Sequence, residues 1–163
     1  MNIALATSNT AQDELFTSAK GRLPGVGPVA TMRRAAFDDF ARRGLPHRRI
    51  EEWKYTDLRA LLREVAPLAP APDQAALARA GAAVKALGIN GTQKFVLVDG
   101  TFVPQLSDVS GLEKGVSLRV LRDVLENKDN AVRADLLQTS VASDAMISLN
   151  TALATDGVMI DVA

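Results

Sequence analysis

The chain has 163 residues with 19 basic and 19 acidic side chains, and this balance removes the long-range positive field that holds nucleic acid or anionic membranes. It has no cysteine, which excludes disulfides, thiolate nucleophiles and cysteine-based metal sites. Neither a signal-peptide pattern nor an apolar run long enough for a membrane helix is present, so we expect a cytoplasmic protein with a mainly aliphatic core.

The first third of the chain predicts short helices separated by glycine and proline. Residues 9–20 have helical spacing. Thr31 is placed to cap a longer helix that ends at Gly44 and Pro46. Thr56 is placed to cap a third helix, which the following prolines terminate.

The middle of the chain changes from helical to extended spacing. An alanine-rich helix is expected over residues 73–87, with Gly88 at its end. Residues 95–103 predict a β-hairpin, because Asp99 and Gly100 form the pair that a two-residue type I′ turn favours.

The last third predicts a strand, two helical stretches and a final strand. Residues 116–120 alternate as a half-buried strand does, and residues 122–138 return to helical spacing with a break. Ser143 or Asp144 can cap the next helix. Residues 158–163 read as a strand whose backbone groups would be unpaired at an open edge, so we expect the natural chain to continue.

These patterns predict an α/β (α+β) chain in which N-terminal helices precede a lobe containing the hairpin. The expected parts are a flexible or weakly helical segment (1–29), a helical lobe (30–66), an Ala-Pro linker (67–72), an α/β lobe (73–156) and a final strand (157–163).

The most distinctive stretch is Leu45–Leu58, which contains the only Trp, the only Tyr and the only His of the chain. It closely resembles the signature of the SufB/SufD family, and of SufD more than SufB. The matching signature residues are Gly44, Leu45, Pro46, Arg49, Glu51, Trp53, Lys54, Tyr55 and Thr56. Two later stretches, 98–102 and 147–158, resemble the family's hairpin and its entry into the central domain.

The resemblance implies an N-terminal region that leads into a right-handed parallel β-helix, whose first strand would be residues 157–163. It also implies a complex with SufB and with the SufC ATPase, whose main contact surfaces would lie beyond Ala163. The iron-sulfur cluster and ATP would belong to that complex. For this chain we expect no cofactor, metal site, catalytic residue, nucleic acid or membrane, since one histidine without cysteine cannot supply the ligands of a cluster.

Two charged patterns have functional alternatives. Glu51 and Glu52 could act as an acid and a base, but adjacent side chains point in different directions, which favours structural pairing with Arg48 or Arg49. In an extended segment, Trp53 and Tyr55 would share one face, with Trp53 as a core anchor.

The arginines of residues 33–49 lie close to Trp53 and Tyr55, a mixture that can bind single-stranded nucleic acid. Interspersed acidic residues favour a solvated helix face instead. A free-standing protein- or nucleic-acid-binding module that uses this face is therefore the alternative function.

Glycines between residues 21 and 27 suggest a phosphate loop but lack the helix and strand context of one, so we expect a connector. His47 follows a proline in a turn and has no second histidine, which favours a surface or capping role over metal binding.

Overall fold

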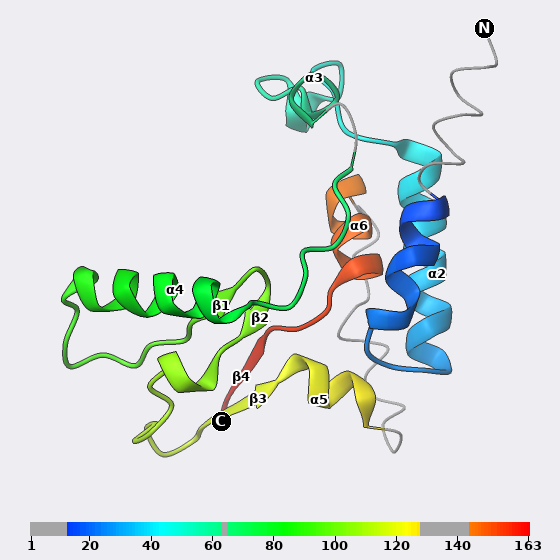
Figure 1. The fold of residues 1–163 in the computed structure, drawn as a ribbon. Coiled ribbons are helices and arrows are strands. Elements are labelled where there is room, and N and C mark those ends of the chain that lie inside the picture. The colour runs from blue at the N-terminus through cyan, green and yellow to red at the C-terminus, as the bar shows by residue number, and fades with distance from the viewer. Residues whose placement is uncertain (1–12, 63–64, 128–143) are drawn as a thin grey trace, which may run out of the picture. The chain divides into compact units, whose positions relative to one another are not determined.

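The structure is a computed structural model that describes residues 13–62, 65–127 and 144–163. The chain divides into two compact units, each assembled from two separate stretches (Figure 1). Unit 1 comprises Met1–Leu68 and Lys128–Ala154, and unit 2 comprises Ala69–Asn127 and Thr155–Ala163. The contiguous lobes expected from the sequence remain a prediction about domain organisation.

Unit 1 is helical in its described part. Residues 13–19 form a helix that continues into the 3-10 turn η1. The further elements are η1 (Lys20–Arg22), α2 (Pro28–Arg43), the 3-10 turn η2 (Glu51–Trp53), α3 (Leu58–Leu62) and α6 (Ala145–Leu153). Helices α2 and α6 lie side by side (Figure 1).

The start of α2 differs from the prediction, and its end agrees. Gly27 is the N-cap and Pro28 the first helical residue, because the fixed φ of proline suits that position. Thr31 is therefore inside the helix, where its hydroxyl donates to the Gly27 carbonyl at 3.2 Å, so its assignment as the cap was wrong. The helix ends at Gly44, whose φ of 69° favours glycine and whose N–H donates to the Phe40 carbonyl at 2.6 Å.

The core of unit 1 is built around stacked aromatic rings. The rings of Phe16 and Phe37 have centroids 4.5 Å apart and planes 20° apart, and Phe40 lies against Phe37 at 6.5 Å. The buried cluster consists of Phe16, Phe37, Phe40, Leu45, Ala145, Leu149 and Ala152. Its two alanines lie on α6, where small side chains allow a close approach to α2.

Unit 2 begins with the alanine-rich helix that the sequence predicted. Helix α4 spans Gln74–Leu87, and the Asp73 carboxylate caps it by accepting from the Ala76 N–H at 2.7 Å. Gly88 ends it in the left-handed conformation with φ of 61°. The other elements are β1 (Leu97–Val98), β2 (Thr101–Phe102), the 3-10 turn η3 (Pro104–Leu106), β3 (Val116–Val120), α5 (Leu121–Glu126) and β4 (Val158–Val162).

The hairpin of β1 and β2 is present. Asp99 and Gly100 have φ of 49° and 78°, the positive values that a type I′ turn requires. The pairing continues one step beyond the strands, since the Val103 N–H donates to the Val96 carbonyl at 2.9 Å. The predicted α/β class with a hairpin-containing lobe is therefore confirmed.

The final strand has a partner that the sequence did not indicate. β4 pairs antiparallel with β3 over five residues, so one edge of β4 is covered. Directly opposed pairs on one face are Val116 with Val162, Leu118 with Ile160 and Val120 with Val158. The expected strand is confirmed, and its role as the first strand of a β-helix remains a prediction.

Asp156 joins the hairpin, α5 and β4 within unit 2. Its carboxylate accepts from the backbone N–H groups of Phe102 at 3.0 Å, Gly157 at 2.8 Å and Arg122 at 3.4 Å. Helix α5 covers only the start of the helix predicted over 122–138, and residues 128–143 lie outside the described part. No helix in the described ranges has the length and apolarity needed to cross a membrane.

Candidate functional site

The signature stretch of unit 1 is a loop held at both ends. Leu45 is buried, as is Pro46, whose carbonyl accepts from the Leu58 N–H at 3.0 Å. The Arg59 Nε donates to the Leu45 carbonyl at 2.9 Å. These two contacts join the start of the loop to the first turn of α3. They keep the first residues of the loop against the core.

Inside the loop the backbone turns instead of extending. The N–H groups of Ile50, Trp53 and Thr56 each donate to the carbonyl three residues earlier, at 2.9, 2.9 and 2.8 Å. Successive bonds of this kind produce the 3-10 turn η2 and a second tight turn after it. The segment is not extended, so the condition under which Trp53 and Tyr55 would share one face is not met.

Trp53 anchors the loop through its indole N–H, which donates to the Asp144 carboxylate. Asp144 is the N-cap of α6, as the sequence allowed, and accepts from the Met146 N–H at 2.6 Å. The indole is half-buried and is not part of the buried core cluster, which corrects the expected core anchor. One carboxylate thus both caps α6 and holds the loop.

Tyr55 lies at the surface with 92% of its area exposed. The Lys54 ammonium lies 5.3 Å from its ring centroid and also pairs with the Glu51 carboxylate at 2.7 Å. An aromatic side chain with so little internal packing contributes little to the folding of this loop, and its ring is free to meet a partner.

The ion pairs of the loop differ from those expected. Arg48 pairs with Asp57 at 3.4 Å, whereas Glu51 pairs with Lys54. Within the described ranges Arg49 and Glu52 form no ion pair with each other or with these neighbours. Asp57 also accepts from the Ala60 N–H at 3.2 Å, so Asp57, and not Thr56, fulfils the capping role at α3.

An open hollow lies beside this loop. Its volume is about 620 Å³, and its lining residues are His47, Arg48, Arg49, Asp57, Arg59 and Ala60. The His47 Nδ1 accepts from the Arg49 backbone N–H at 3.2 Å, a turn-stabilising contact of the kind expected for His47. Among the described residues, no three potential metal ligands cluster closely enough to hold an ion.

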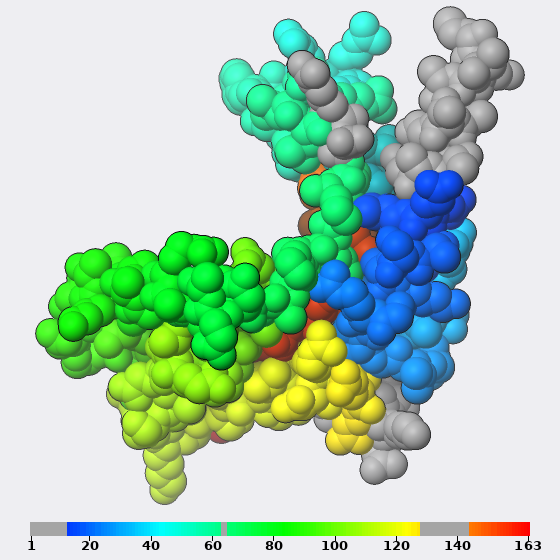
Figure 2. Space-filling model, in the orientation of Figure 1, coloured from blue at the N-terminus to red at the C-terminus, as the bar shows by residue number. Residues whose placement is uncertain are grey.

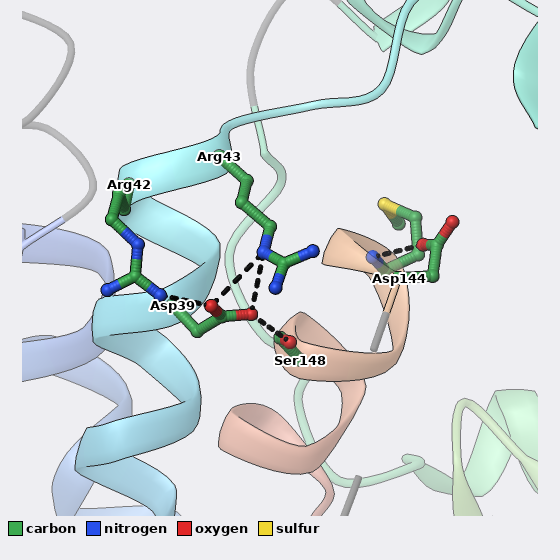
Figure 3. Close-up of polar contacts among 6 residues, drawn as sticks. Asp39, Arg42, Arg43, Asp144 and Ser148 are labelled. Carbon is green, nitrogen blue, oxygen red and sulfur yellow. Dashed lines mark hydrogen bonds and ion pairs between the residues drawn. The ribbon is translucent and has the colours of Figure 1, made fainter. Parts of the chain in front are cut away.

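A polar network links α2 to α6 near the loop (Figure 3). The Asp39 carboxylate accepts from the Ser148 hydroxyl at 2.7 Å, from the Arg43 Nε at 3.1 Å and from Arg42. Burial alone would raise the pKa of Asp39, but the Ser148 hydroxyl and the guanidinium groups of Arg43 and Arg42 outweigh it and lower the pKa. Ser148 is itself buried, so its hydroxyl depends on this acceptor.

We expect Asp39→Asn to remove part of the acid sensitivity of unfolding. A pKa lowered by folding contributes stability above the unfolded value near 4, and this contribution disappears as the pH falls through the folded pKa. The substitution should therefore cost roughly 1–2 kcal/mol at pH 7 and progressively less below about pH 4. Urea unfolding measured across this pH range tests it.

Asp38→Asn is the control, because it removes the neighbouring carboxylate from an exposed ion pair with Arg34. It should change the free energy of unfolding at pH 7 by less than about 0.5 kcal/mol. Equal loss for Asp39→Asn at every pH would contradict the linkage.

We expect Trp53→Phe to lower the free energy of unfolding by about 1 kcal/mol, because it removes the hydrogen bond to Asp144 while keeping an aromatic ring. In an Asp144→Ala background the same change should cost almost nothing. A double-mutant cycle followed by circular dichroism measures this coupling. Independent, additive losses would show that the indole contact contributes no stability.

Arg33 is a structural residue that the sequence did not reveal. It was expected on a solvated arginine face, yet only 2% of it is exposed, which corrects that assignment. Its Nε and Nη2 donate to the Pro24 carbonyl at 3.2 and 3.1 Å, and its Nη1 donates to the carbonyls of Thr151 and Ala152 at 3.2 Å. The signal was positional: Arg33 follows Val29 by four residues and precedes Phe37 by four, in the buried stripe of α2.

Comparison with protein families matches residues 9–163 to the SufBD protein N-terminal region. The match includes all of unit 2, unit 1 from residue 9 onward and the whole signature loop. A comparison with curated proteins gives no match. Since the family match covers nearly the entire chain, this protein belongs to the SufBD family, whose members act in SUF iron-sulfur cluster assembly.

Proposed function

We propose that the chain is the N-terminal region of a SufD-type subunit that acts as a non-catalytic scaffold in a cytoplasmic complex with SufB and SufC. The observation that carries the proposal is the family match over residues 9–163. The choice of SufD over SufB is supported by the closer likeness of the Trp53–Thr56 signature and by the lack of cysteine.

The side-chain inventory supports a scaffold role. Iron-sulfur clusters are held by thiolates, or by thiolates together with imidazoles. This sequence offers a single imidazole and no thiolate. In the proposal, therefore, the cluster forms on other parts of the complex and ATP is hydrolysed by SufC.

The geometry of the signature residues also supports an architectural role. Pro46 is buried, Trp53 is tied to the cap of α6, and the carbonyl of Leu45 is bound by Arg59. These side chains shape and attach a loop to the α2–α6 pair. What the loop then presents outward is its exposed tyrosine and arginines.

The test is to tag the chromosomal copy of the gene and isolate the protein from its own cells. We expect SufB and SufC to co-purify in fixed proportion. The chain purified alone should contain no stoichiometric iron and sulfide and should not hydrolyse ATP. Absence of both partners would overturn the assembly role, and stoichiometric cluster or ATPase activity in the isolated chain would overturn the scaffold role.

The alternative is a binding module for protein or nucleic acid, and the exposure of Tyr55 is the observation that favours it. Titration with a single-stranded oligonucleotide at two salt concentrations separates the two forms of this alternative. Affinity that falls steeply with salt and is lost in Tyr55→Ala would favour nucleic acid.

A further inference from the structure

The hollow beside the signature loop is lined by more positive than negative side chains. Three guanidinium groups line it, those of Arg48, Arg49 and Arg59, against the single carboxylate of Asp57. This local excess exists in a chain whose net charge is zero. Because the whole protein is neutral, the positive charge here comes from the local arrangement of these side chains. Such a surface attracts carboxylates or phosphates by short-range Coulomb interaction.

Two of the arginines are held in position through one nitrogen each. The Arg59 Nε donates to the Leu45 carbonyl at 2.9 Å, and the Arg48 Nε pairs with Asp57 at 3.4 Å. Both contacts use Nε, and each guanidinium has two further nitrogens with which to bind an oxyanion. A guanidinium held in this way loses less side-chain entropy when it forms paired hydrogen bonds with a carboxylate.

The loop and α3 also carry large hydrophobic and aromatic side chains that are exposed to solvent. These residues lie close to the three arginines in the sequence. Tyr55 is 92% exposed and Leu61 is 70% exposed, with Ile50 and Leu62 also at the surface. In the space-filling view the segment that carries them, cyan to teal, stands out from the rest of unit 1 (Figure 2). Tyrosine and arginine are among the residue types most enriched at the energetic centres of protein interfaces.

We propose that the arginine-lined hollow, together with the exposed Tyr55 of the same loop, binds an acidic segment of a partner protein. Carboxylates of the segment would bind Arg48, Arg49 and Arg59, and a neighbouring apolar side chain would cover Tyr55. A small-molecule site usually encloses its ligand, whereas these arginines lie along an open hollow, with 73% of the Arg48 side chain exposed. The inference is independent of the assembly role proposed above.

A randomised peptide library displayed on phage, selected against the purified full chain, provides the probe. We expect the enriched peptides to combine Asp or Glu residues with an aliphatic or aromatic residue. A soluble peptide from this pool should bind less tightly as salt rises, since charge pairs at an open surface are screened.

The hollow variant is Arg48→Gln with Arg49→Gln, and its matched control is Arg79→Gln with Lys85→Gln on α4. Both change the net charge equally, and all four side chains are exposed. The hollow variant should weaken the peptide at least about tenfold. The control should leave its affinity unchanged. Circular dichroism of both variants establishes that they are folded.

Three outcomes would overturn the proposal. Selection could yield no acidic peptides, or the hollow variant could bind them as tightly as the parent chain does. Inorganic phosphate could bind with the peptide's own affinity and displace it, which would assign the hollow to a free oxyanion. Salt-sensitive capture of a single-stranded oligonucleotide, lost in the hollow variant, would assign it to nucleic acid.

Discussion

Arg33→Met is expected to lower the free energy of unfolding of unit 1 by about 3 kcal/mol or more. Methionine fills most of the same space, but it cannot donate to the carbonyls of Pro24, Thr151 and Ala152. Buried acceptors that lose their donor each carry a desolvation penalty. Urea unfolding followed by the fluorescence of Trp53, the only tryptophan, reports on this unit.

The cost comes from the position of those carbonyls. Thr151 and Ala152 belong to the last turn of α6, where backbone acceptors have no partner within the helix and where a positive charge is favoured by the helix dipole. Arg33 supplies both the donors and the charge, and it binds the loop before α2 through Pro24 at the same time. Removal of Arg33 therefore weakens both its attachment to the loop before α2 and its attachment to the end of α6.

Arg33→Lys separates the charge from the geometry. A lysine keeps the positive charge but cannot reach both groups of carbonyls in the fixed fork of a guanidinium, so we expect an intermediate loss of about 1–2 kcal/mol. Arg34→Met is the matched control, because Arg34 is half-exposed and pairs with Asp38 at the surface. A loss for Arg33→Met no larger than that of the control would refute the role of Arg33.

Helix α4 and the hairpin of β1 and β2, which depend on local signals, were predicted correctly. Asp73 and Gly88 bound α4 because a cap and a left-handed glycine act within one turn of the helix. The hairpin needed only Asp99 and Gly100, whose turn positions require positive φ. In each case the residues that determine the structure are neighbours in the sequence.

Features that depend on distant partners were not predicted. The pairing of β3 with β4 joins residues about forty positions apart, and the sequence of neither strand identifies the other as its partner. Arg33 shows the same problem in the core: arginines are usually exposed, so its place in the apolar stripe of α2 was outweighed by residue type.

For the candidate site, the sequence singled out the signature loop but did not predict what its side chains contact. The signature loop was identified from Trp53 and Tyr55, yet these two side chains have opposite environments. Trp53 binds a carboxylate 91 positions later, whereas Tyr55 faces solvent. The tight turn from Trp53 to Thr56 separates them, and local spacing alone could not distinguish this turn from an extended segment.

Phe37→Ala is expected to lower the free energy of unfolding by about 4 kcal/mol. Phe37 is fully buried, its ring stacks on Phe16 at 4.5 Å, and it contacts Phe40. Truncation removes this apolar area and leaves a cavity that the surrounding helices can only partly fill. Urea unfolding followed by Trp53 fluorescence measures the loss.

Two further substitutions keep this prediction testable if the alanine variant does not fold. Phe37→Leu retains most of the volume and should cost about 1–2 kcal/mol, since it loses the ring stacking but creates a smaller cavity. Tyr55→Ala removes an aromatic ring of similar size from the surface of the same unit and should cost less than about 0.5 kcal/mol. Comparable losses for Phe37→Leu and Tyr55→Ala would mean that ring burial at Phe37 does not hold the core together.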